Sequence, residues 1–186
     1  MKTQRMTKAD LGKQQGFSLT ELMLVLVVIA LLIGGIFGLM KIVKSDQEIT
    51  QLKSAVLTVN AKVMGFAAGA GQYGTGNLNN VLIQANQVPD FFVVSGTTIT
   101  HPVGGTNGQL IVEGRGPLYA ITVTGLKRED CINFLTGLNG FKRVFVDTSS
   151  TAPANVSTGG TVPPISKITA TSLCTATTGN AVHLVN

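Results

Sequence analysis

The amino-acid sequence predicts an α+β fold, in which one long N-terminal α-helix packs on a mostly antiparallel β-sheet. Three observations predict it. Residues 17–40 are almost entirely apolar, residues 41–68 carry a single apolar stripe at helical spacing, and residues 69–186 hold short alternating segments among many Gly, Thr, Ser and Asn residues. A length of 186 residues suits one apolar segment and one compact domain.

Residues 1–16 are short, polar and basic, and they concentrate the charge of the chain. Four cations and one acid give them +3 of the formal +5: Lys2, Arg5, Lys8, Lys13 and Asp10. The remaining residues are close to neutral and show no basic patch interleaved with aromatic residues. Direct binding of nucleic acid is therefore not predicted.

The segment from Leu22 to Met40 has nineteen residues without a charge, about 28 Å as a helix, which is enough to span a bilayer core. A secretory signal peptide has a shorter apolar core, of about 7–15 residues, and a small-residue cleavage site. Here Lys41 and Lys44 follow the run instead. We expect a retained single-pass membrane segment with a cytoplasmic N-terminus and an exported C-terminal domain.

The helix is expected to continue from Phe17 to about Ala68, with its second half amphipathic. Six apolar residues step by three and four positions and predict a stripe that packs on the sheet: Ile49, Leu52, Val56, Val59, Val63 and Phe66. Gly65 and the glycines from Gly69 onward indicate where the helix ends.

The C-terminal part, residues 69–186, reads as alternating short elements. A short helix or turn is expected in 78–92, strands in 97–102, 108–114, 118–125, 141–147 and 181–185, and a helix in 127–140. Within the 118–125 strand, Tyr119, Ile121 and Val123 share one face. Residues 148–164 are poor in apolar residues and rich in Gly and Pro, which predicts an exposed loop.

No pattern typical of catalysis or of a metal site occurs. The two histidines, His101 and His183, lie on different predicted strands, and the nucleophile, zinc and phosphate-loop motifs are absent from the sequence. Glu129 and Asp130 stand at a helix start, where acids suit the helix dipole. We expect no enzymatic activity, no metal and no cofactor.

The only cysteines are Cys131 and Cys174, and two interpretations are open. They are buried free thiols, or they form a disulfide, which an exported domain and an even count favour. A bridge across 43 residues would contribute about 4 kcal/mol on the loop-entropy model.

Glu21 is the one acid at the edge of the apolar run, and its local sequence also allows two interpretations. Ser18-Leu19-Thr20-Glu21 fits the S-x-x-E capping box at a helix start. Alternatively, a cut between Gly16 and Phe17 would create an α-amine one turn from Glu21. A carboxylate and an amine in apolar surroundings would pair between neighbouring copies and set their stagger.

A basic leader ending in Gly16, then Phe17-Ser18-Leu19-Thr20-Glu21 and a long apolar stretch, resembles the class III signal of type IV pilins and pseudopilins. The resemblance is close over residues 13–45. It implies that a membrane peptidase cuts after Gly16 and methylates Phe17, and that Glu21 guides subunit docking.

The segments 88–92, 99–105 and 119–138, with a late second cysteine, resemble the type IVb pilins, the group of the bundle-forming and toxin-coregulated pilins. Two features depart from the patterns of the family: a Phe17 start is commoner in type IVa, and the proline often found in the type IVa membrane helix is missing. Three glycines lie in that region, and they either loosen the helix on assembly or allow close helix packing: Gly34, Gly35 and Gly38.

The resemblance implies the structural subunit of a thin extracellular fibre of a Gram-negative cell, stored in the inner membrane. The implied partners are other copies, the prepilin peptidase and methylase, an inner-membrane platform with its ATPase, and an outer-membrane secretin. Adhesion, aggregation and conjugative contact are the expected roles. A minor pilin or type II secretion pseudopilin is one alternative, and a membrane-tethered exported binding domain that never polymerises is another.

Overall fold

The computed structural model describes residues 18–66 and 71–186. The chain divides into two compact units, residues 1–42 and 43–186. Among the described residues, none of the helices combines the length and the apolarity that a membrane crossing requires.

The elements, in chain order, are α1 (Leu19–Phe66), β1 (Thr75–Asn77), α2 (Asn79–Gln84), β2 (Val93–Ser95), β3 (Thr98–Thr100), the 3₁₀ helix η1 (Pro102–Asn107), β4 (Gln109–Arg115), β5 (Leu118–Leu126), α3 (Arg128–Leu135), β6 (Arg143–Asp147), α4 (Lys167–Leu173) and β7 (Asn180–Val185).

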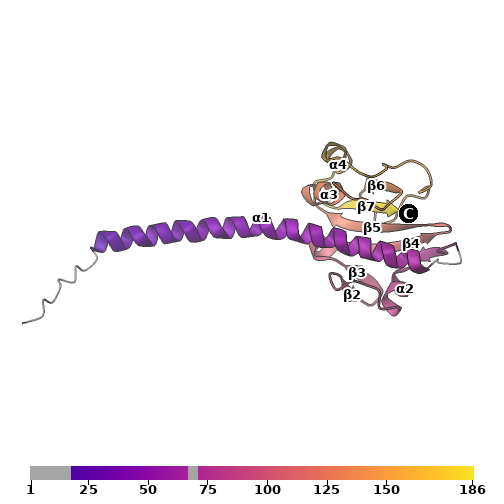
Figure 1. The fold of residues 1–186 in the computed structure, drawn as a ribbon, viewed down its shortest axis with the longest axis horizontal. Helices are drawn as coiled ribbons and strands as arrows, with labels where there is room; N and C mark the ends of the chain where they lie inside the picture. Colours follow the sequence, from indigo (N-terminus) through magenta and orange to yellow (C-terminus); the bar gives the residue numbers. More distant parts are fainter. Residues whose placement is uncertain (1–17, 67–70) are drawn as a thin grey trace, which may run out of the picture. The chain divides into compact units, whose positions relative to one another are not determined.

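The second unit contains a seven-stranded sheet, in which six strands follow the order β2-β3-β4-β5-β7-β6 and β1 pairs with β4 off this path. The second half of α1 lies across one face of the sheet (Figure 1). All strand pairs are antiparallel. Strands β4 and β5 form a simple hairpin, which turns through Gly116, a residue in the left-handed region of backbone conformation. The predicted α+β class with an antiparallel sheet is confirmed.

The helix buries the predicted stripe on this sheet: Ile49, Leu52, Val56, Val59 and Val63 are all buried. Phe66, which was expected to complete the stripe, is 38% exposed, so that expectation is wrong. Phe66 is the last residue of α1, and Val63 is the last position of the helix that the core covers. Ala55 and Asn60 are buried in addition.

Strand β5 is buried on both faces. Tyr119, Ile121 and Val123 belong to the main core beneath α1, as their alternation predicted. Ala120, between them, belongs to a second, smaller cluster, which includes Val156 from the segment that follows β6. The sheet therefore has a core on each side, and the second one is small.

Residues 148–164 form a mostly exposed loop, as predicted, but this loop also provides the second cover of the sheet. Ala152 and Val156 are buried, although most of the other residues in the segment are exposed. The backbones of Thr161 and Val144 exchange two hydrogen bonds of 2.8 Å each, so the segment also pairs with the edge of β6. Gly160 makes this approach possible, since a Cβ there would meet the carbonyl oxygen of Val144 at 2.9 Å.

Two elements differ from the expectation for local reasons. Helix α4 was not predicted because Lys167–Leu173 is rich in β-branched residues, which are modest helix formers. Its start is capped by Ser166, whose hydroxyl accepts from the amide of Thr169 at 3.2 Å. The strand expected in 97–102 spans only Thr98–Thr100, and the η1 turn begins at Pro102, which has no N–H to donate to a sheet.

Asn79 fills a gap at the edge of β4. Strand β3 pairs with β4 at residues 109–110 and β1 pairs with it at residues 113–115. Between them, the Asn79 side-chain amide donates to the Leu110 carbonyl (3.0 Å) and its oxygen accepts from the Val112 amide (2.9 Å). A buried side chain thus replaces one step of a β-ladder and fixes α2 beside the sheet.

We predict that Asn79→Ala lowers the free energy of unfolding by about 1–3 kcal/mol, because it leaves two buried backbone groups of β4 without partners. Chemical denaturation of the full chain in detergent, followed by circular dichroism, measures the change. Asn80→Ala is the matched control, since Asn80 is exposed on the same helix. Equal stability of the two variants would contradict this role for Asn79.

Candidate functional site

Gly16 and Phe17, the predicted positions of cleavage and methylation, lie outside the described residues, which begin at Ser18. Glu21 stands in the first turn of α1 and is exposed. The amides of Glu21 and Leu22 donate to the Ser18 carbonyl oxygen at 2.9 and 3.1 Å, and the Ser18 hydroxyl lies 2.6 Å from that of Thr20. Backbone bonds hold this turn, and the capping-box interpretation is wrong because the Ser18 hydroxyl faces Thr20. The Glu21 carboxylate is thus not used in a cap.

The side chains from Leu19 to Ile33 form an exposed apolar surface around the start of α1. The exposure extends all round the helix, as at Leu22 (56%), Met23 (64%) and Leu24 (66%). Monomeric soluble proteins rarely expose a contiguous apolar surface of this kind, and such a surface marks contact with a membrane or another protein. Gly34, at the end of this stretch, has no atom within 4 Å of where a Cβ would stand.

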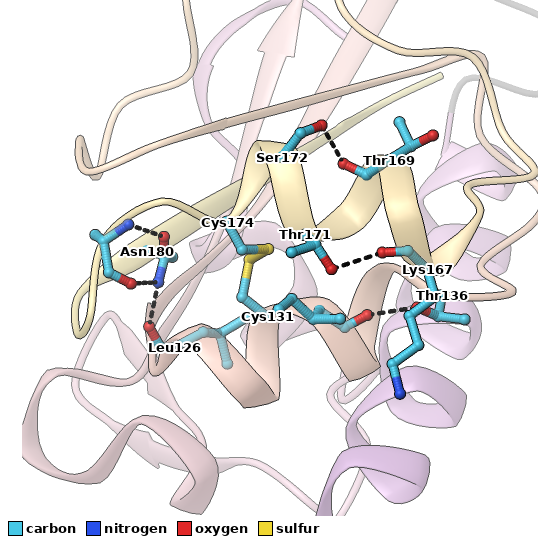
Figure 2. The surroundings of a disulfide bond; sticks show 11 residues. Leu126, Cys131, Thr136, Lys167, Thr169, Thr171, Ser172, Cys174 and Asn180 are labelled. Carbon is cyan, nitrogen blue, oxygen red and sulfur yellow. Dashed lines mark hydrogen bonds between the residues drawn. A yellow bond between two sulfur atoms is a disulfide. The ribbon is translucent and has the colours of Figure 1, made fainter.

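A disulfide joins Cys131 in α3 to Cys174 at the end of α4, with the two Cα atoms 6.0 Å apart (Figure 2). Both residues are fully buried, and the alternative of two free thiols is excluded. The bond closes a segment of 43 residues that contains β6, the 148–164 segment and α4. The two short helices therefore lie side by side although neither is long enough to be stable alone.

Polar side chains complete the surroundings of the disulfide. The Asn180 side-chain amide donates to the carbonyls of Leu126 (3.0 Å) and Ala176 (2.8 Å) and thereby fixes the start of β7 beside the end of β5 (Figure 2). The Lys53 ammonium, from α1, donates to the Thr136 carbonyl at the end of α3 (2.8 Å). Partial burial lowers the pKa of Lys53. The second half of α1 is thus tied to the disulfide-linked helices.

His183 lies in a buried chain of polar groups on the face of the sheet opposite α1. Its Nδ1 is 2.9 Å from the Thr122 hydroxyl, and its Nε2 is 2.9 Å from Asp147 Oδ1. The order of hydroxyl, imidazole and carboxylate is that of a hydrolytic triad. However, Thr122 and His183 are fully buried, so no substrate can reach the hydroxyl. The three groups link β5, β7 and β6 and serve the fold.

His101 is also buried and joins η1 to β5. Its Nδ1 accepts from the Gly104 amide (3.3 Å), and its Nε2 lies 3.2 Å from the Thr124 carbonyl oxygen, so the ring is held as a neutral imidazole. Burial lowers the pKa of His101 to about 4, and the bond to Thr124 opposes this shift. Within the described residues, no group of acidic, His and Cys side chains could hold a metal ion.

A third polar cluster was missed by sequence analysis. The Tyr119 hydroxyl donates to the Asn60 side-chain oxygen and accepts from the amide of Asn186, the last residue of the chain (3.1 Å). Burial raises the pKa of Tyr119 to about 12, and the Asn186 bond opposes that shift. Asn60 lies four positions after Val56, so it belongs to the edge of the apolar stripe. A polar residue at this position was the available indication of a buried polar contact.

Two comparisons with known proteins find a likeness, in different parts of the chain. Residues 11–37 match the model of the prokaryotic N-terminal methylation motif. The fold is similar to the crystal structure of TcpA, a type IV pilin from Vibrio cholerae El Tor biotype, with a TM-score of 0.53 and 22% sequence identity over 75% of this chain and 99% of that one. A comparison with curated proteins found no match.

The chain thus combines an N-terminal methylation motif with a fold similar to that of a type IV pilin, an N-terminal helix packed on a mostly antiparallel sheet. The expected resemblance to the group of toxin-coregulated pilins is confirmed by the similarity to TcpA.

The second unit, residues 43–186, which we call the head, is predicted to lose stability as the pH falls from about 6.5 to about 4. The folded protein keeps His101 neutral in this range, whereas the unfolded chain binds a proton there, so protons favour unfolding. The contribution of His101 at neutral pH is about 3 kcal/mol, and it is lost by pH 4. Denaturation of the parent and of His101→Asn across this range measures it. The pH dependence should be shallower in the variant, and parallel curves would contradict the prediction.

Proposed function

We propose that the chain is the structural subunit of a type IV pilus of the type IVb kind, which polymerises through residues 17–40 into a thin extracellular fibre. The observation that carries the proposal is a methylation motif over residues 11–37 on the same chain as a TcpA-like fold. The exposed apolar surface of α1 supports it, because a fibre or a membrane would cover that surface.

In this proposal the apolar surface has two successive environments. Before assembly, residues 17–40 lie in the inner membrane as a single pass with a cytoplasmic N-terminus, and after assembly they lie among the helices of neighbouring copies. Apolar contacts replace lipid contacts, so leaving the membrane need not expose this surface to water. Head-to-tail contacts of this kind give an open helical polymer.

Glu21 sets the axial register in this proposal. Cleavage after Gly16 frees the amine of Phe17, which is then methylated, and the Glu21 carboxylate of one copy pairs with the amine of another. Both charges are poorly solvated among apolar helices, so each favours the other over an unpaired position. That Glu21 is exposed and is not used by a capping box supports its availability for such a pair.

The partners that follow are a prepilin peptidase and methylase, an inner-membrane platform with its ATPase, and an outer-membrane secretin. The exported heads would form the outer surface of the fibre, for adhesion, aggregation or conjugative contact. A minor pilin or pseudopilin would share the leader and Glu21 but would be scarce in sheared surface fibres.

The mature protein is predicted to begin at Phe17 with a methylated amine. Intact-mass measurement and N-terminal peptide mapping of the protein from its own cells test this. A chain that keeps Met1–Gly16 would instead support the membrane-tethered binding domain that never polymerises. Gly16→Glu should block the cut and leave the leader in place.

Glu21→Ala is expected to leave cleavage largely intact but to reduce the yield of sheared fibres at least about tenfold, since one buried charge then lacks its partner. Glu129→Ala is the control, because it removes an equally exposed acid from α3. Fibre protein is measured by immunoblot against total cellular protein. Normal fibre yield from Glu21→Ala would refute the docking role.

A further inference from the structure

The segment 148–164 is fixed on the sheet at several points, and it creates a hollow at one end of the sheet. Besides the Thr161–Val144 pairing, the Arg143 guanidinium donates to the Gly159 carbonyl (2.6 Å), and the Arg115 guanidinium donates to the Ala152 carbonyl (2.9 Å). Val156 is buried in the second core. The walls of the hollow are therefore built before any ligand arrives.

The hollow has a volume of about 460 Å³, within the usual range of small-molecule sites. Four apolar side chains line it, from the starts or ends of the strands and from the covering segment: Leu118, Val156, Val162 and Val185. Val162 is 64% exposed, which leaves an apolar wall open to solvent. The hollow thus has room and apolar surface for the body of a small ligand.

Two cations, Lys142 and Arg143, complete the lining with Ser157, and none of its described residues is acidic. The bond to Gly159 uses one nitrogen of the Arg143 guanidinium and holds the group in place. The remaining N–H groups of a guanidinium can bind a carboxylate in a fork geometry. A guanidinium held in place beside the ammonium of the exposed Lys142 suits a single carboxylate.

We propose that this hollow binds an amphiphilic monocarboxylate of the fatty-acid type, with its carboxylate on Arg143 and Lys142 and its alkyl chain along Leu118, Val156 and Val162. The apolar walls select a ligand with an apolar body, and the two cations select an anionic head. The site lies wholly in residues 118–185, so it does not depend on whether the chain polymerises.

The test uses decanoic acid that carries a photoreactive diazirine near its methyl end, irradiated with the purified full chain in non-ionic detergent. Peptide mapping by mass spectrometry then locates the label. We expect label in the peptides that contain Leu118, Val156 or Val162, and competition by decanoate but not by decanol. Label confined to the apolar helix of residues 19–34, or competed equally by decanol, would overturn the proposal.

Three variants separate binding from folding. Lys142→Gln keeps the Arg143–Gly159 bond, and Val162→Asp places an acid at an exposed position without disturbing the core. Each of these two variants should reduce labelling of the head several-fold. Lys142→Gln removes a charged hydrogen-bond donor to the ligand carboxylate, and the acid of Val162→Asp repels that carboxylate. Lys167→Gln makes the same charge change at an exposed position of α4, outside the hollow, and should not reduce labelling. Equal labelling of all three variants would also overturn the proposal.

Discussion

The packing of the second half of α1 on the sheet is the constraint on which the rest of the head depends. Each buried Val, Leu or Ile of the stripe contributes about 1.5–3 kcal/mol relative to an exposed one, and the stripe supplies five of them. Apolar contacts alone are non-directional. Two polar contacts give the helix its position on the sheet: Lys53 with the end of α3, and Asn60 with Tyr119 and the chain end.

The disulfide supports the short helices α3 and α4 and the segment between them. Helices α3 and α4 have eight and seven residues, too few to be stable without support, and one of them begins at a serine cap in a β-branched segment. Linking them closes the segment that covers the second face of the sheet. The cover over β5 thus belongs to the segment that the disulfide encloses, and so do the residues that line the hollow at Arg143, apart from Leu118 and Val185.

Periodicity predicted the elements that bury one continuous face. The stripe on α1 and the alternation at Tyr119, Ile121 and Val123 were correct because each is repeated over several turns or residue pairs. The burial of Phe66 was predicted wrongly, and α4 and the two buried residues of the 148–164 loop were missed, because the environments of these residues come from distant parts of the chain. Nothing near Val156 in the sequence indicates that Ala120 and Val185 will cover it.

The candidate sites divide in the same way. The disulfide could be predicted because the sequence has only one pair of cysteines. The methylation motif could be recognised because its residues are contiguous. The residues of the Thr122–His183–Asp147 chain, and those that line the hollow at Arg143, come from three or more separate segments. No local sequence pattern could therefore predict either group. In the sequence His183 is an isolated histidine, and its hydrogen bond to Thr122 depends on the strand register that places Thr122 opposite it.

Burial also decides how the two kinds of exposed surface should be understood. The polar groups of the head are paired: among its described residues, no buried side-chain nitrogen or oxygen lacks a hydrogen bond. The start of α1 is different, because its apolar side chains are exposed all round and its one acid is not used in a cap. A helix that is apolar all round is a buried or membrane-spanning helix in its working state. The exposed apolar surface at the start of α1 thus lies in the part of the chain that the methylation motif overlaps.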